Sequence, residues 1–386
     1  WRLSKTSTTL VPSSSWILVS SELGTMKQLV IFNLQTDSSS VVLGASIDWI
    51  KELRNHFAVT DVVSTHVGPH DGLDNLRIIE IGGGSIWYKL IALIRLLRFS
   101  IYLIPRRNEY LVFHHMSPRT AVFPGILFKI FGIPQGLWYS HSSRPISLQI
   151  AARIVNWVFS SEADSLPLKS RKAYFVGHGI SLNRFNASRP ILDRDLSILF
   201  LGRLSKIKNL DNLVNAVAKL KNRITVVLVG PQSDKRFAEN LKQLASRQNV
   251  RLEIEDAIGY NQVNRKMNQF KYFYSGMKNS VDKSALEAAI SGCLVISTEN
   301  GTLDLSGMRK AWDEFQLAIP NSIQGQIMQL EELKNQDISL FQQIAQADAI
   351  SKNGIEKTGT MAIIHRPYWK PRMESRSNHL PATNAP

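Results

Sequence analysis

The stretch 196-LSILFLGRLSKIKNLDNLVNAVAKLK-221 decides the fold. It opens with an apolar run of strand length, turns at Gly202, and continues from Asn209 as a pattern typical of an amphipathic helix. A second apolar run, 224-ITVVLVGP-231, follows directly and predicts another strand. A strand, a helix and a strand in this order indicate parallel strands joined by a crossover helix.

The same alternation extends in both directions from this unit. Towards the C-terminus, residues 251–258 predict a weaker strand, 284–292 a helix and 293–298 a strand. Towards the N-terminus, the predicted strands are 27–34, 109–116, 135–141 and 172–179, and the predicted helices are 44–57 and 120–132. A polar break at 183–195 separates the two series. We therefore expect two doubly wound, Rossmann-like α/β domains facing across a cleft.

The predicted domain limits follow from these patterns. The N-terminal domain spans 26–190 and the C-terminal domain 191–350. Residues 1–25 look like an extension of doubtful relevance, because they precede the first methionine without the order of a signal peptide. Residues 351–386 mix Pro, Ser and Asn without a regular period, which predicts a disordered or atypical tail.

Composition narrows the class of partner. The formal net charge of +15 favours an anionic partner: a phosphorylated ligand, a nucleic acid or an anionic membrane. The single cysteine, Cys293, excludes an internal disulfide and suits a reducing compartment. Residues 86–105 form an apolar stretch that carries Lys89, Arg95 and Arg98. We interpret it as a core helix with a basic outer face, in preference to a helix lying on a membrane surface.

Three motifs carry candidate chemistry. Arg203 and Lys208 follow the strand that ends before Gly202, where two cations can converge on a diphosphate or can be ordinary surface charges. Glu287 lies in the predicted helix 284–292, where it can accept hydrogen bonds from ribose hydroxyls or merely complement the helix dipole. The sequence Gly177-His178-Gly179 suggests a tight turn.

Other patterns are weak. The run 82-GGG-84 lacks the spacing of a dinucleotide-binding fingerprint. Asp193 and Asp195 match an Asp-x-Asp pattern, but they precede a strand instead of following one, so we expect no metal site there. No zinc-ligand spacing occurs in the sequence.

Taken together, the segments GRLSKIKN, VVLVGP, LEAAISGCLVIST and FVGHGISLNRF resemble the family-4 glycosyltransferases of the GT-B fold, over about residues 27–340. The resemblance implies that Arg203 and Lys208, with Gly202 before them, grip the pyrophosphate of the donor. It implies that Glu287 binds the ribose and that Gly230 lies near the base. Gly44 falls where the family has a glycine loop near the phosphates.

The resemblance also points to residues near the donor sugar. His141 occupies the position of a strand-end histidine of the family. Asn279 stands where the family has its first glutamate, so that this position holds no charge. Asp282 and Lys283, in the variant loop 280-SVDK-283, are expected to replace the missing acid, or else to form an internal salt bridge that shapes the loop.

The implied activity is transfer of a hexose from a nucleoside-diphosphate sugar to a glycan or lipid-linked acceptor, with retention of configuration. The family needs no cofactor beyond this donor and usually no metal. Such an enzyme in polysaccharide or lipopolysaccharide biosynthesis is expected to be cytoplasmic, with peripheral contact to an anionic inner membrane surface. The alternatives are an epimerase or hydrolase acting on nucleotide sugars, or a binding protein without turnover. Nucleic acid is not an expected partner, because no basic–aromatic recognition motif accompanies the charge.

Overall fold

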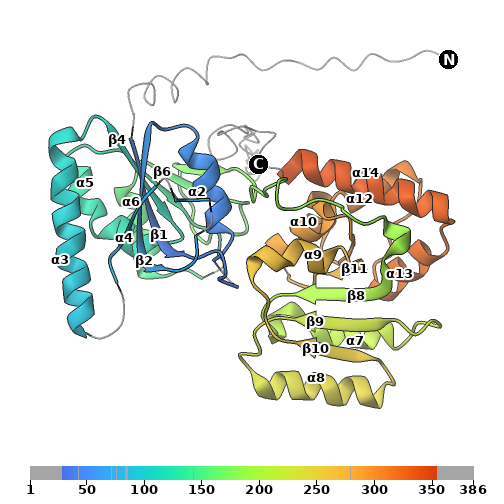
Figure 1. The fold of residues 1–386 in the computed structure, drawn as a ribbon. Coiled ribbons are helices and arrows are strands. Elements are labelled where there is room, and N and C mark those ends of the chain that lie inside the picture. Colours follow the sequence, from blue (N-terminus) through green and yellow to red (C-terminus); the bar gives the residue numbers. More distant parts are fainter. Residues whose placement is uncertain are drawn as a thin grey trace, which may run out of the picture.

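The computed structural model describes residues 28–353 except 42, 71, 75, 83–85, 142 and 279, together with the side chains outside 86–90. The predicted extension 1–25 and residues 354–386 of the predicted tail lie outside the described residues. Two parallel sheets build the chain, one from its N-terminal half and one from its C-terminal half (Figure 1). The prediction of two doubly wound α/β domains is confirmed.

The N-terminal domain contains a seven-stranded parallel sheet in the order β3-β2-β1-β4-β5-β6-β7. Its elements are β1 (Gln28–Thr36), α2 (Ser46–Arg54), β2 (Val59–Val67), β3 (Arg77–Glu80), α3 (Ile86–Leu103), the 3-10 turn η1 (Ile104–Arg106), β4 (Tyr110–His115), α4 (Pro118–Val122), α5 (Gly125–Ile130), β5 (Gln135–Trp138), α6 (Ile146–Ile154), β6 (Trp157–Ser160) and β7 (Ala173–Phe175).

Helices cover both faces of this sheet, and the central strand β1 shows how. Leu29 and Ile31 point into a cluster with Ile47 and Ile50 of α2. The alternate residues of β1 point to the opposite face, where they pack in a cluster that includes side chains of α3 and α5. A strand buried on both faces explains the unbroken apolar run of β1.

The C-terminal domain contains a five-stranded parallel sheet in the order β10-β9-β8-β11-β12. Its elements are η2 (Ile191–Asp193), β8 (Asp195–Leu201), η3 (Lys206–Lys208), α7 (Leu210–Val217), β9 (Thr225–Val229), α8 (Lys235–Arg247), β10 (Leu252–Glu255), η4 (Tyr260–Gln262), α9 (Val263–Met267), β11 (Phe270–Tyr274), α10 (Lys283–Ile290), β12 (Leu294–Ile296), α11 (Asn300–Leu305), α12 (Met308–Glu314), α13 (Ile323–Glu331) and α14 (Asn335–Asn353).

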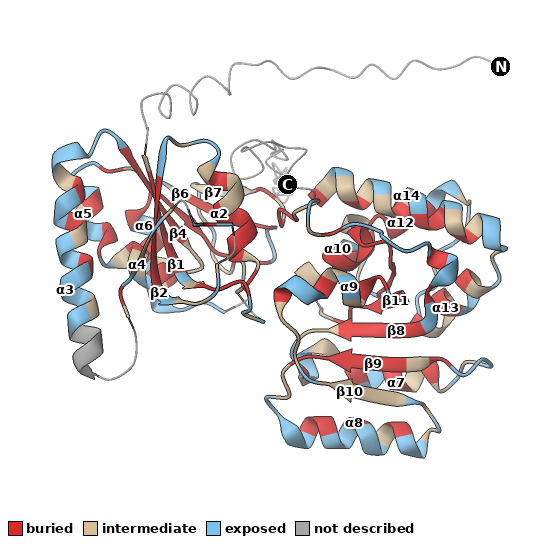
Figure 2. Ribbon diagram, in the orientation of Figure 1, coloured by how far each residue is buried: buried red, intermediate tan, exposed pale blue. Residues whose placement is uncertain are grey.

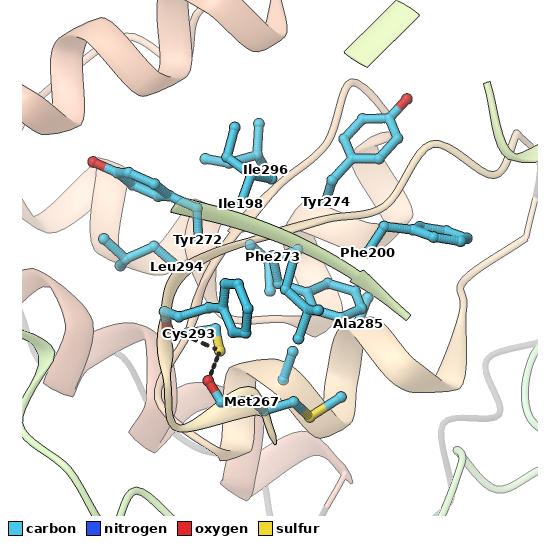
Figure 3. Packing of buried hydrophobic residues seen from close by; sticks show 14 of the residues in the cluster. Ile198, Phe200, Met267, Tyr272, Phe273, Tyr274, Ala285, Cys293, Leu294 and Ile296 are labelled. Carbon is cyan, nitrogen blue, oxygen red and sulfur yellow. Dashed lines mark hydrogen bonds between the residues drawn. The ribbon is translucent and has the colours of Figure 1, made fainter. Parts of the chain in front are cut away.

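One contiguous core fills this second domain. Figure 3 shows its centre, where Ile198 and Phe200 of β8 lie among side chains of β11 and β12. Cys293 is buried at its edge and donates to the carbonyl oxygen of Met267 at 3.2 Å. The segment 176–194 joins the two sheets, and α14 ends against it, since the amide of Ile180 donates to the carbonyl oxygen of Asn353.

Several predicted elements need correction. The single helix expected at 120–132 is two short helices, because Pro124 lacks an amide proton and excludes Phe123 from helical dihedrals. The sequence patterns do not identify the strands β2, β6 and β11. Helix α14 continues to Asn353, three residues into the segment predicted as an atypical tail.

The interpretation of residues 86–105 as a core helix with a basic outer face is confirmed only in part, since Leu96 and Leu103 are buried in the core and Arg95 and Arg98 are exposed. Residues 86–103 do form the helix α3, but its outer side carries large exposed apolar side chains as well as arginines. Figure 2 shows that most of the described part of α3 is exposed. No helix in the described part of the chain is long and apolar enough to cross a membrane.

Candidate functional site at the strand ends

The site is built from the loops that follow the strands of both sheets. In the C-terminal domain, Gly202 follows β8 and Gly230 follows β9, and the two backbones lie against each other. A β-carbon on Gly230 would lie 2.0 Å from the carbonyl oxygen of Gly202. Their φ angles are +152° and +151°, which also favour glycine. These two glycines therefore allow the ends of the adjacent strands β8 and β9 to pack closely. We call this edge of the sheet the rim.

Lys208 lies in η3, directly after this rim, and it has an acidic partner. Its ammonium nitrogen lies 2.5 Å from Oδ1 of Asp282 and 3.2 Å from the sulfur of Met277. Both members of the ion pair are mostly enclosed. Lys208 is therefore not an ordinary surface charge. Arg203, in contrast, is exposed and has no ion pair among the described residues.

Glu287 is buried in α10, with 4% of its surface exposed, and it makes one hydrogen bond and one ion pair. The hydroxyl of Tyr260 donates at 2.9 Å and the ammonium of Lys283 lies at 3.0 Å. Both contacts go to Oε1, so Oε2 has no hydrogen-bond partner among the residues described. Burial and the charge of Glu287 raise the pKa of Tyr260 well above its usual value, which keeps this phenol a donor.

Lys283 and Asp282 are thus both in ion pairs, but not with each other. Asp282 pairs with Lys208 from η3, and Lys283 pairs with Glu287 one helical turn later. One expectation for this loop is an internal salt bridge that shapes it. The loop does form salt bridges, but with Lys208 and Glu287 and not between Asp282 and Lys283. The variant loop holds two of the predicted donor-binding residues, Lys208 and Glu287, in place.

Tyr260 also contacts the N-terminal domain. A β-carbon on Gly44, which precedes α2, would lie 2.6 Å from the β-carbon of Tyr260. The guanidinium of Arg184 lies over the ring of Tyr260, 5.0 Å from its centre. The same guanidinium binds both carboxylate oxygens of Asp48 in α2, at 2.7 and 2.8 Å. Gly44 therefore lies where the two domains meet.

A second junction forms near His141. His141 follows β5, is exposed, and its amide donates to the carbonyl oxygen of Ser165. The hydroxyl of Ser165 lies 3.2 Å from that of Ser280, at the start of the variant loop. The amide of Val281 in the same loop donates to Oε1 of Glu162 at 2.9 Å. The segment that carries His141 is thus tied to the loop that carries Asp282.

The imidazole of His141 has a defined tautomer in its neutral form. Its Nδ1 accepts from the amide of Ser143 at 2.9 Å, so the proton is on Nε2. An exposed Nε2–H at the end of β5 is therefore available as a hydrogen-bond donor.

Two further histidines lie close to Lys283. His115, at the end of β4, has its Nδ1 3.0 Å from Oδ1 of Asn33, and burial together with the charge of Lys283 lowers its pKa to about 4. His178 is 8% exposed, and the same two causes lower its pKa to about 3. Nε2 of His178 is buried without a hydrogen-bond partner in the described part of the chain. A buried polar atom without a protein partner needs an explanation, and a bound water or ligand is one.

The remaining candidates give no site. Asn279 lies outside the described residues. Asp193 belongs to η2 and Asp195 begins β8, at the end of the strand away from the site. Across the described ranges, no cluster of three or more His, Cys, Asp or Glu side chains can hold a metal ion.

Sequence patterns missed Tyr260, Arg184, Asp48 and Glu162. Arg184 lies within the quoted segment 175-FVGHGISLNRF-185 but had no assigned role. Tyr260 lies in 257-AIGYNQV-263, which has no motif-like spacing. Each becomes visible only when the two domains are packed together, because each side chain contacts residues of a distant segment.

Comparisons with known proteins agree with this architecture. Residues 195–321 match the family described as "Glycosyl transferases group 1". Anabaena HepE, solved in complex with UDP-glucose, has a TM-score of 0.66 at 14% identity, over 87% of this chain and 98% of that chain. Sucrose-phosphate synthase from Thermosynechococcus elongatus has a TM-score of 0.63 at 14% identity, over 86% and 96%.

The lipopolysaccharide outer core galactosyltransferase WaaB in its apo form has a TM-score of 0.57 at 13% identity, over 87% of this chain and 99% of that chain. Among curated protein sequences, none matches this chain. The predicted GT-B architecture is confirmed. The chain has the GT-B fold, and its C-terminal domain, which holds the Lys208 and Glu287 ion pairs, is similar to the glycosyl transferases of group 1.

Proposed function

We propose that this protein is a glycosyltransferase that moves a sugar from a nucleoside diphosphate to a glycan or lipid-linked acceptor. The observation that carries the proposal is the pair of connected ion pairs, Lys208–Asp282 and Lys283–Glu287, at the strand ends of the domain that matches glycosyl transferases group 1. These ion pairs lie at one edge of a parallel sheet, where ligands of such sheets bind. They contain two cations, Lys208 and Lys283, and the carboxylate of Glu287, which we propose as the ribose ligand.

The chemistry follows from the charges. A departing diphosphate gains negative charge, and we assign its stabilisation to Lys208 and Arg203. Asp282 holds the ammonium of Lys208, so a diphosphate must compete with this carboxylate. Oε2 of Glu287 is the atom we assign to a ribose hydroxyl, since Oε1 already accepts from Tyr260 and Lys283.

The finer assignments belong to the same proposal. We propose a hexose as the transferred sugar, retention of its configuration as in family 4, and no metal in the reaction. HepE in complex with UDP-glucose makes UDP-hexoses the first donors to test. WaaB makes a lipopolysaccharide-type acceptor the first to test. A cytoplasmic location at the membrane surface fits such an acceptor.

Rival activities on the same fold need another carboxylate in the site. Glu162 is the nearest candidate, but its Oε1 already accepts from the amide of Val281 and from the hydroxyl of Ser165. Asp282 is paired with Lys208. Oε2 of Glu162 has no hydrogen-bond partner among the described residues, so acceptor-dependent release of the nucleoside diphosphate is the observation that separates transfer from epimerisation or hydrolysis.

A donor panel tests the proposal. UDP-glucose, UDP-galactose, GDP-mannose and free UDP are each added to the protein, and the melting temperature and nucleoside diphosphate release are measured with and without a mixed glycan and glycolipid acceptor extract. We expect one nucleotide family to raise the melting temperature and release to require the acceptor. Binding without release under any condition would support a binding protein, and no binding would reject the nucleotide-sugar site.

The ribose assignment predicts a loss of nucleotide affinity in Glu287→Gln. The amide keeps an oxygen for Tyr260 and preserves the shape, but it removes the charge that strengthens a hydrogen bond to a ribose hydroxyl. We expect the dissociation constant of the nucleotide, measured by calorimetry, to rise about tenfold or more. Glu239→Gln, on the exposed face of α8, is the matched control and should bind as the wild type does. Equal affinity in both variants would remove Glu287 from the site.

A further inference from the structure

Helix α3 turns apolar side chains away from the protein. Leu96 and Leu103 point inward and are buried in the core below the helix. On the opposite side, Ile94 is 50% exposed and Ile101 is 54% exposed, with Leu97 between them. A surface helix normally places polar residues on this side, so the outward apolar row requires an explanation.

The apolar surface continues onto a neighbouring helix. Phe128 of α5 packs in the same cluster as Leu96 and Leu103 of α3, so both helices lie on one face of the sheet. On α5, Ile130 is 71% exposed and Ile126 is also exposed. We call Ile94, Leu97, Ile101, Ile126 and Ile130 the outer patch. Figure 1 shows α3 and α5 side by side at the edge of the molecule away from the C-terminal domain.

The chain segment that carries the outer patch is rich in positive charge. Residues 81–161, which include both helices, contain nine Lys or Arg residues and one acidic residue, Glu109. This span therefore supplies more than half of the formal net charge of +15. Arg98 on α3 and Arg106 and Arg107 just after it are exposed. The patch is an apolar surface bordered by cations.

A basic hollow lies further along the same side of the domain. Helix α6 contacts α5, and its residues Gln149 and Arg153 line a cavity of about 920 Å³. The other cations that line it are Arg144, Lys169 and Arg171, and no acidic side chain lines it. A hollow of this composition suits phosphate groups.

Charge decides among the partners that could cover this surface. A second copy of the chain would bring the same cations against it, and like charges repel. Nucleic acid would satisfy the arginines but would leave exposed isoleucines without an apolar partner. An anionic bilayer satisfies both, since acyl chains accept the isoleucines while phosphate headgroups lie at the level of the arginines.

We propose that the N-terminal domain docks on an anionic membrane surface through the outer patch, with Arg98, Arg106 and Arg107 among the lipid headgroups. The helix lies in the plane of the membrane and does not cross it. The proposal rests on exposure and charge in α3 and α5, and it holds whether or not the protein transfers a sugar.

Vesicle flotation of the full chain tests the docking surface. Vesicles of phosphatidylglycerol and phosphatidylcholine in equal amounts should carry the protein, and vesicles of phosphatidylcholine alone should carry at least about tenfold less. Ile94→Glu/Ile101→Glu should lower the partition coefficient on anionic vesicles by about tenfold or more, because two inserted side chains are lost and two negative charges are added. Arg98→Gln/Arg106→Gln/Arg107→Gln should have an effect of similar size.

Matched variants on the C-terminal domain serve as controls. Met328→Glu/Leu340→Glu changes two exposed apolar side chains of α13 and α14, and Lys235→Gln/Arg236→Gln/Arg247→Gln removes three exposed cations of α8. Both should float like the wild type, and all variants should melt at similar temperatures. Absence of flotation on anionic vesicles would overturn the proposal, as would equal losses in the control variants. A wild-type dimer that Ile94→Glu/Ile101→Glu makes monomeric, with no vesicle binding, would assign the surface to self-association instead.

Discussion

Lys208→Ala will lower kcat/KM for sugar transfer by about two to three orders of magnitude, the usual effect of removing one group that stabilises developing negative charge. The ammonium nitrogen of Lys208 lies 2.5 Å from Oδ1 of Asp282. Lys208 itself lies in the turn that follows β8. Arg203→Ala should lower kcat/KM by about a hundredfold. Arg203 is exposed, so its replacement should leave the melting temperature unchanged.

Lys208→Ala should also lower the stability of the fold, and this effect must be separated from its effect on transfer. Without Lys208, the mostly enclosed carboxylate of Asp282 loses its ion-pair partner, which should cost about 1–3 kcal/mol of unfolding free energy. The double variant Lys208→Ala/Asp282→Ala removes both charges and should regain most of this stability. Its kcat/KM should remain low, because the diphosphate still lacks its cation.

Lys206→Ala is the control for this experiment. Lys206 lies in the same 3-10 turn as Lys208 but is exposed, so transfer and stability should both stay near the wild-type values. Recovery of activity in the double variant would mean that Lys208 serves only to neutralise Asp282. Wild-type activity in Lys208→Ala would contradict the diphosphate assignment outright.

The part of the site that could be predicted from sequence lies within single strand–loop–helix units. Gly202, Lys208 and Glu287 each follow a recognisable strand or begin a recognisable helix, so their spacing places them at a strand end without knowledge of the tertiary fold. Their partners could not be predicted in this way. Arg184 binds Asp48 across 136 residues of sequence, and this pair exists only because the two domains pack together.

The missed strand β2 has a similar physical cause. It contains Asp61, a buried carboxylate that breaks the apolar pattern expected of a central strand. Arg77 of β3, the residue paired with Asp61 in the sheet, binds this carboxylate through both Nε and one terminal nitrogen. A buried charge is acceptable only with such a partner, and the sequence alone does not show that the two strands are neighbours.

For α3, periodicity could establish a helix but not its orientation. Apolar residues occur all round it, so the pattern is equally compatible with either side facing the core. The structure buries Leu96 and Leu103 and leaves Ile94 and Ile101 outside. The prediction of a core helix with exposed arginines therefore holds, but it did not include the exposed isoleucines, because the shape of the sheet below selects which side chains face the core.

Acidification should destabilise this protein before its carboxylates are protonated. Burial lowers the pKa of His114 to about 3, and burial together with the charge of Lys283 lowers that of His178 to about 3. In the unfolded chain both imidazoles titrate near 6.5. Between these values the unfolded state binds more protons than the native state, so stability is fully present above about pH 6.5 and is lost as the pH falls.

The expected loss is large. Each of the two histidines costs about 1.4 kcal/mol for every pH unit below 6.5, so the free energy of unfolding should fall by about 4 kcal/mol between pH 6.5 and pH 5. This is a substantial share of the roughly 5–15 kcal/mol typical of folded proteins. His115, whose pKa is lowered to about 4, is half-buried and should add a smaller amount.

Urea unfolding at several pH values between 7.5 and 5 measures this slope. His114→Gln removes one titrating group from the core of the N-terminal domain and should flatten the slope by about 1.4 kcal/mol per pH unit. His178→Asn should flatten it by a similar amount, although its side chain lies at the strand ends and not in that core. A free energy of unfolding that stays constant from pH 7 to pH 5 would show that these imidazoles are not buried in the neutral form. A slope that neither variant changes would assign the acid sensitivity to other groups.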